Sequence, residues 1–176
     1  MPSPRPPADA TAGPAPVPVI ADAGSADEIA AVRALVAEYQ VSLGVDLEFQ
    51  GFSAELAGLP GAYAPPRGAL LLATIDGAAV GCVALRPIDD TQCEMKRLYV
   101  RPAGRGFGLG RALAERAIDR ARAAGYRRML LDTLPTMGDA QALYRRLGFV
   151  DVPPYRDNPI PGTRFLALDL ILSASP

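Results

Sequence analysis

The chain has 176 residues, of which 49% are hydrophobic, 18 are basic, 19 are acidic and none is histidine. This length suits one domain with a continuous core and is short for two. The absence of histidine excludes a Ser-His-Asp or Cys-His nucleophile, a histidine general base and histidine-ligated metals. Two cysteines alone cannot supply the usual four ligands of a zinc site, so we expect no metal.

The N-terminal segment is rich in Pro and Ala and has no apolar run of signal-peptide length. We expect residues 1–18 to form a disordered or polyproline-like tail and residues 19–172 to form the domain. No stretch approaches the roughly 18 to 20 apolar residues that a membrane span needs. The sequence therefore predicts a soluble cytoplasmic protein with no membrane partner. In that compartment Cys82 and Cys93 are expected to be buried free thiols.

The first hundred residues predict one capped helix followed by antiparallel strands. Ser25 and Glu28 have the spacing of a capping box, and Gly44 is suited to end the helix that starts there. Asp76-Gly77 is a two-residue hairpin turn between two strand patterns. The expected elements are a strand over 18–23, a helix from 25 to about 43, an irregular helical stretch over 46–59, and strands over 69–75, 78–85 and 92–100.

After residue 100 the pattern changes to a strand–helix–strand unit. Apolar residues recur at every fourth position from Leu109 to Ala121, which predicts the buried stripe of a helix. An antiparallel half joined to a parallel βαβ unit predicts one mixed sheet with helices on both faces, an α/β (α+β) fold. The expected elements are helices over 109–124 and 139–147, and strands over 128–133, 149–152 and 165–172.

Charge is unevenly distributed along the chain. Residues 96–128 contain ten basic and two acidic residues, whereas residues 1–60 contain two basic and eight acidic ones. A local basic centre in a nearly neutral protein favours a small polyanionic ligand over nucleic acid, which usually requires a broader basic face. We therefore expect no nucleic-acid partner.

The strongest motif is RPAGRGFGLGR at 101–111, between a predicted strand and a predicted helix. Backbone N–H groups and the positive end of the helix dipole converge on an anion at such a junction. The spacing fits neither the dinucleotide-binding G-x-G-x-x-G nor the P-loop, which ends in Gly-Lys-Ser/Thr. What remains is R-x-x-G-x-G, running from Arg105 to Gly110.

This loop resembles the pyrophosphate loop for coenzyme A in the GNAT superfamily of N-acetyltransferases. LYVRP at 98–102 and AQALYRRLGF at 140–149 resemble the family's strand before that loop and its later helix and strand. The resemblance covers about residues 94–149. It implies a GNAT-like fold, acetyl-CoA as co-substrate, and acetyl transfer to a primary amine, with a small molecule as the expected acceptor. The implied cofactor contacts are Leu98, Tyr99, Val100, Arg105, Gly106, Phe107, Gly108, Leu109, Gly110 and Arg111.

The resemblance also implies catalytic roles. Glu94 matches a strand glutamate that some members use as general base, directly or through water, although an ordinary strand glutamate is the equal alternative. Tyr144 is expected near the cofactor sulfur, where it would protonate the leaving thiolate. At Met137 the family often carries an Asn that binds the cofactor, and this sequence departs from it.

A break in the apolar alternation between Met95 and Leu98 predicts a β-bulge near Lys96-Arg97. The family has such a bulge beside the thioester, where main-chain groups can hold the pantetheine arm. The acceptor is expected between residues 39–52 and the loop 155–165. The candidate acceptor contacts are Phe49, Gln50, Asp132, Thr133, Arg156 and Asn158.

Two questions remain open from the sequence. The acceptor cannot be named, and neither can the oligomeric state, although a homodimer is common in the family. A coenzyme A sensor without catalysis is the alternative function, but the retention of both Glu94 and Tyr144 favours an enzyme.

Overall fold

The computed structural model describes residues 15–171 of the chain. Most of the predicted tail lies outside these residues, and strand β1 already begins at Pro18. The α-helices are α1 Ala26–Leu43, α2 Phe52–Ala57, α3 Leu109–Ala123 and α4 Gly138–Arg146, with short 3-10 turns at Glu48–Gln50, Gly61–Tyr63 and Pro102–Gly104. The strands are β1 Pro18–Asp22, β2 Ala69–Ile75, β3 Ala78–Pro87, β4 Gln92–Val100, β5 Arg128–Thr133, β6 Val150–Val152 and β7 Arg164–Asp169.

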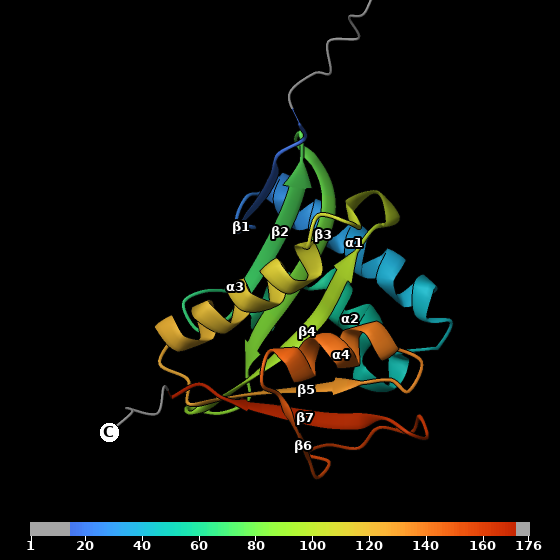
Figure 1. The fold of residues 1–176 in the computed structure, drawn as a ribbon, viewed down its shortest axis with the longest axis vertical. Coiled ribbons are helices and arrows are strands. Elements are labelled where there is room, and N and C mark those ends of the chain that lie inside the picture. Colours follow the sequence, from blue (N-terminus) through green and yellow to red (C-terminus); the bar gives the residue numbers. More distant parts are fainter. Residues whose placement is uncertain (1–14, 172–176) are drawn as a thin grey trace, which may run out of the picture.

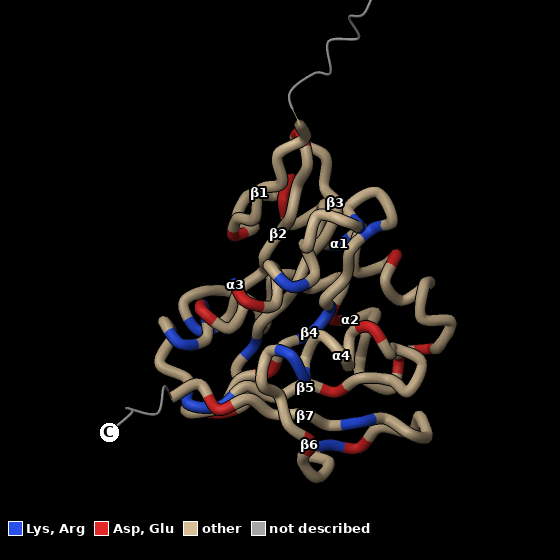
Figure 2. The backbone as a smooth tube through the Cα atoms, in the orientation of Figure 1, with Lys and Arg blue, Asp and Glu red and all other residues tan. Residues whose placement is uncertain are grey.

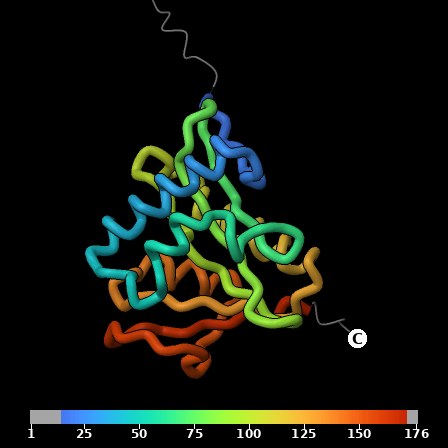
Figure 3. Tube along the Cα trace, turned by 180° about the vertical axis from the view of Figure 1, so that it is seen from behind, coloured from blue at the N-terminus to red at the C-terminus, as the bar shows by residue number. Residues whose placement is uncertain are grey.

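The strands form one mixed sheet in the order β1-β2-β3-β4-β5-β7-β6. All neighbouring pairs are antiparallel except β4 and β5, which run parallel on either side of the α3 crossover. Helices α3 and α4 cover one face of the sheet (Figure 1), and α1 and α2 cover the other (Figure 3). The predicted mixed-sheet fold is confirmed.

Strand β2 shows why both faces need a helical layer. It is apolar throughout, so alternate side chains enter two different cores. Leu70 and Leu72 pack in the core under α1 and α2, whereas Leu71 and Ala73 pack in the core under α3 and α4. The β-strand period of two therefore distributes one hydrophobic run between the two layers.

The predicted helix start and hairpin turn are confirmed. The Ser25 hydroxyl accepts a hydrogen bond from the Glu28 N–H at 3.2 Å, and the Glu28 carboxylate accepts one from the Ser25 N–H at 2.9 Å. Asp76 (φ 49°) and Gly77 (φ 82°) both adopt the left-handed conformation that a tight hairpin requires. Cys82 and Cys93 are buried free thiols, as expected.

The last strand is shorter than the predicted span of 165–172. Strand β7 ends at Asp169, because Asp169 pairs with Arg128, the first residue of β5, and no ladder partner follows. The predicted end at residue 172 lies outside the described residues. The predicted irregular helical stretch over 46–59 consists of a 3-10 turn and the short helix α2.

Strands β4 and β5 pair over only three residues and then separate. Gln92–Glu94 pair with Arg128–Leu130, and β5 continues beside β7 alone. On the β3 side, Cys82 faces Tyr99 and Ala84 faces Lys96, so two residues of β4 stand opposite one of β3. This is the predicted β-bulge, with Arg97 at φ 59°. The bulge and the separation leave the β5-facing edge of β4 without a strand partner after Glu94, within the described sheet.

Candidate active site

A groove of about 690 Å³ opens where β4 leaves β5. It is bounded by the second half of β4, the loop before α3, the first turn of α3 and helix α4. All predicted cofactor contacts line it except Phe107, whose side chain is exposed instead. Those that line it are Leu98, Tyr99, Val100, Arg105, Gly106, Gly108, Leu109, Gly110 and Arg111.

The loop before α3 is fixed by side-chain contacts of Arg101 where it begins, and its backbone is accessible at Gly108 where it ends. The Arg101 guanidinium pairs with the Glu38 carboxylate of α1 at 2.8 and 2.5 Å and donates to the Ala79 carbonyl oxygen at 2.6 Å. Gly108 caps α3 with φ 70°, a conformation that costs a residue with a Cβ free energy. A Cβ at Gly108 would meet no atom within 4 Å, so the backbone here is accessible to a ligand. The N–H groups of the first turn of α3 can therefore meet an anion.

Helix α3 carries both signs of charge. Figure 2 shows acidic and basic positions interspersed along it, and Arg111 pairs with Glu115 at 2.7 Å. Arg122 likewise pairs with Asp119 at 3.5 Å. Part of the basic excess seen in the sequence is thus compensated on the helix itself.

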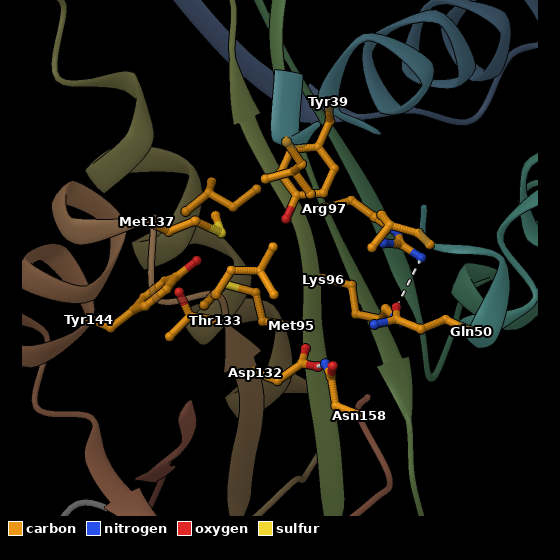
Figure 4. Close-up of a pocket in the computed structure, with 14 residues that line it drawn as sticks. Tyr39, Gln50, Met95, Lys96, Arg97, Asp132, Thr133, Met137, Tyr144 and Asn158 are labelled. Carbon is orange, nitrogen blue, oxygen red and sulfur yellow. Dashed lines mark hydrogen bonds between the residues drawn. The ribbon is translucent and has the colours of Figure 1, made fainter. Parts of the chain in front are cut away.

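A smaller cavity of about 40 Å³ lies next to the groove. The two spaces share four wall residues, Tyr39, Leu43, Leu98 and Met137, so they are adjacent. Tyr144 and Thr133 lie on one side of this cavity and Lys96 and Gln50 on the other (Figure 4). Of the predicted acceptor contacts, Gln50, Asp132, Thr133 and Asn158 line the cavity.

Two predicted acceptor contacts lie elsewhere. Phe49 does not line the cavity, and its side chain is exposed. Arg156 also lies outside the lining, but its Nη2 donates to Asp132 Oδ1 at 2.7 Å. Asn158 Nδ2 donates to the other oxygen, Asp132 Oδ2, at 3.0 Å. Arg156 therefore orients the Asp132 carboxylate, which lines the cavity, from a position outside the cavity lining.

Tyr144, which is expected to lie near the cofactor sulfur, lines the inner cavity. Its ring is buried against Phe149, with centroids 5.7 Å apart. No protein group of residues 15–171 hydrogen-bonds its hydroxyl. Burial raises the pKa of Tyr144, so the hydroxyl stays protonated and can donate a hydrogen bond to a group in the cavity.

Glu94, the predicted general base, lies in a buried network of charged residues. Its carboxylate is 1% exposed and does not line the cavity. One oxygen accepts from Arg86 Nε at 2.8 Å, and the other accepts from the Tyr155 hydroxyl at 2.9 Å and forms an ion pair with Arg156 Nη2 at 2.8 Å. With both oxygens bound, Glu94 holds two arginines in place.

Sequence reasoning missed the two charged residues at the bulge. Lys96 Nζ donates to Gln50 Oε1 at 2.9 Å, and Arg97 forms two 2.9 Å contacts to the Glu55 carboxylate. Both side chains are buried and both line the cavity. Burial, followed by the neighbouring Arg97 charge, lowers the pKa of Lys96 to about 7. Two adjacent charges in the middle of an otherwise buried strand were the signal available in the sequence.

Comparison with known proteins decides the family. Residues 32–149 match the model of the Acetyltransferase (GNAT) family. The chain belongs to the GNAT family. An uncharacterised N-acetyltransferase of Schizosaccharomyces pombe is 44% identical over 140 residues, covering 78% of this chain and 86% of that protein.

Solved GNAT structures share the fold. An acetyltransferase from Streptococcus agalactiae superposes with a TM-score of 0.73 at 22% identity, covering 86% of this chain and 98% of that one. A Salmonella typhimurium protein solved with its cofactor acetyl-CoA gives a TM-score of 0.61 at 24% identity, covering 90% and 97%. The family match and the N-acetyltransferase relative identify this GNAT protein as an enzyme, an N-acetyltransferase, and not a sensor.

Membrane-spanning helices and metal-binding clusters are both absent from residues 15–171. No helix between residues 15 and 171 is long and apolar enough to cross a membrane. Over the same range, no three or more His, Cys, Asp or Glu side chains gather in a way that could hold a metal ion. The departure at Met137 puts a thioether on the wall shared by the groove and the cavity.

Proposed function

We propose that this GNAT enzyme binds acetyl-CoA in the groove and transfers the acetyl group directly to a primary amine of a small molecule in the inner cavity. The observation that carries the proposal is that the two spaces adjoin, sharing four wall residues, at the point where β4 leaves β5. A cofactor lying along the unpaired edge of β4 would have its thioester beside Tyr144. The acetyl-CoA-bound Salmonella relative supports the choice of donor.

The residues of the groove suit the three parts of the donor. Backbone N–H groups at the start of α3, with Arg105 and Arg111, would hold the pyrophosphate. The unpaired main-chain groups of Leu98 and Val100 would hold the pantetheine amides as an added strand does. A backbone N–H at the bulge would stabilise the oxyanion that forms on the thioester carbonyl.

Tyr144 would assist departure of the thiolate. Burial raises the pKa of the Tyr144 phenol further above that of a thiol, so full proton transfer from Tyr144 to the thiolate is unfavourable in free energy. The phenol can still donate a strong hydrogen bond to the developing charge on sulfur. Neither cysteine lines the cavity, and both are buried in the sheet. An acetyl-cysteine intermediate therefore has no candidate residue among those lining the site, which favours direct transfer.

Deprotonation of the acceptor amine does not require Glu94. The Lys96 charge in the cavity wall, whose partner is the neutral Gln50 amide, disfavours an ammonium ion beside it, so an amine bound there has a lowered pKa. The amine can then enter the attack in its neutral form, with water accepting the proton. The narrow cavity favours a small molecule as acceptor.

Calorimetry with two donors tests the proposed donor site. Acetyl-CoA should bind at one saturable site, and S-acetylpantetheine, which lacks the pyrophosphate, should bind at least about tenfold more weakly because it cannot use the N-terminus of α3. Equal affinities for the two donors would remove the loop from the binding site.

A further inference from the structure

The cavity wall carries one positive charge that no acidic residue in the described part of the chain compensates. The cluster around it contains four cations, Arg86, Lys96, Arg97 and Arg156, and three anions, Glu55, Glu94 and Asp132. Each of the three acids is paired with at least one arginine. Within residues 15–171, no carboxylate lies within ion-pair distance of the Lys96 ammonium, whose protein partner is the neutral Gln50 amide. The excess charge of the cluster therefore resides on Lys96.

An uncompensated buried cation is costly unless a ligand supplies the counter-charge. Lys96 is 6% exposed, and of the two spaces it lines the inner cavity alone. The anionic groups of coenzyme A would lie at the loop before α3, in the outer groove, so they do not reach it. Of the three N–H bonds of Nζ, one is used by Gln50 and two remain for a ligand.

The composition of the chain also distinguishes Lys96 from the other basic residues. Lys96 is the single lysine in the sequence, against 17 arginines. An ammonium is a compact point charge, whereas a guanidinium needs a wider planar partner. A second polar group also faces the cavity without a partner in the described protein: the Thr133 hydroxyl is buried and lacks a hydrogen bond.

We propose that the acceptor is an amine that also carries a carboxylate, and that Lys96 binds this carboxylate inside the cavity. The proposal rests on the transfer function proposed above and specifies its substrate class. One carboxylate matches the single excess charge, whereas a phosphate group, with a charge of about −1.5 to −2 at pH 7, would exceed it. Bound carboxylate would also hold Lys96 in its protonated form.

The single lysine makes the binding step directly observable. In protein labelled with ¹³C-lysine, one Cε resonance reports the Lys96 titration, whose midpoint in the free protein lies near 7. The charged groups that influence this titration are Arg97, Glu94, Arg156 and Arg86. Glycine, β-alanine, aspartate and glutamate are each compared with the fully amidated counterpart, in which every carboxylate is a carboxamide and the amine is kept. We expect at least one acid, and none of the amides, to raise the midpoint by about 1–3 pH units.

Turnover of the same pairs tests the class of acceptor. With acetyl-CoA as donor, kcat/KM for the preferred acid should exceed that for its amide by about 10–100-fold. Lys96→Met, which removes the charge and keeps the length, should bring this ratio close to one. Arg116→Met is the matched control, because Arg116 is exposed on α3 and lines neither space. Melting curves verify that both variants are folded.

The outcomes are separable. No shift of the Lys96 midpoint with any acid, or equal shifts with the amides, overturns the carboxylate proposal whether or not transfer occurs. A higher kcat/KM for neutral amines than for acids, in the parent and in Lys96→Met alike, also overturns the carboxylate proposal. An equal loss of kcat on acids and amides in Lys96→Met assigns the lysine to proton transfer instead. Absence of thiol release with every amine contradicts the transfer function, while the titration still decides the charge of the ligand.

Discussion

Replacing Glu94 by Gln separates the structural role of this residue from the general-base role suggested by the sequence. The substitution keeps the shape of the side chain and removes the charge that Arg86 and Arg156 share. Breaking a buried ion pair by removing one partner typically costs about 3–5 kcal/mol. The arginine side chains are 29% and 20% exposed, so water offsets part of the loss, and we expect the lower end, about 3 kcal/mol.

For a domain of this size, 1 kcal/mol shifts the melting temperature by about 2–4 °C, so Glu94→Gln should lower it by about 6–12 °C. Asp119→Asn is the control, since its pair with Arg122 is exposed and an exposed pair contributes about 0–1 kcal/mol. Thermal unfolding followed by circular dichroism measures both variants. Turnover of Glu94→Gln, measured well below its melting temperature, should stay within about tenfold of the parent, because Glu94 does not line the cavity.

The opposite pattern would refute this reasoning. A general base supplies about 10²–10⁴-fold in rate and little stability. A melting temperature within about 2 °C of the parent, together with a rate loss of that size and a lost acidic limb in the pH–rate profile, would restore Glu94 as the base.

Three further predictions concern Gly108 in the groove, the Tyr144 hydroxyl and the two cysteine thiols. Gly108→Val places a β-branched residue at φ 70°, where a Cβ meets no protein atom within 4 Å, so the fold should be retained while the side chain occupies the approach to the N-terminus of α3. Coenzyme A affinity should then fall by at least about tenfold. Unchanged affinity by calorimetry would contradict the loop assignment. Tyr144→Phe removes the hydrogen bond proposed for the leaving sulfur, so turnover should fall by about 10²–10³-fold. The melting temperature should change little, because the hydroxyl has no hydrogen-bond partner among residues 15–171; full turnover would show that the hydroxyl takes no part in the reaction. Burial raises the pKa of both Cys82 and Cys93 to about 12, so a disulfide reagent at pH 8 should react with them only after denaturation, and rapid reaction of the folded protein would show that they are accessible.

Local patterns in the sequence were sufficient to predict the elements. The capping box at Ser25, the hairpin turn at Asp76-Gly77 and the four-residue repeat of α3 depend on residues near one another in the chain. The bulge at Arg97 was also predictable, because a shift in apolar alternation is itself a local signal. The groove followed from the family resemblance and from the glycine-rich loop.

The charged network could not be predicted from the sequence. Glu94 binds Arg86 eight residues away but also Tyr155 and Arg156 about sixty residues away, and no periodicity carries that information. Likewise, Gln50 reaches Lys96 across a sequence separation of 46 residues. Which acidic residue is paired, and which cation is left over, depends on the order of strands in the sheet.

One reaction tests the proposed function most directly. Acetyl-CoA is incubated with the enzyme and a panel of amines that contains both carboxylate-bearing and neutral members, and free thiol and acetylated product are quantified together, the latter by mass spectrometry. We predict thiol and N-acetylated product in equal amounts, with the highest rate on a carboxylate-bearing amine. Saturable binding of acetyl-CoA with no thiol and no acetylated product from any amine would contradict catalysis in this cavity.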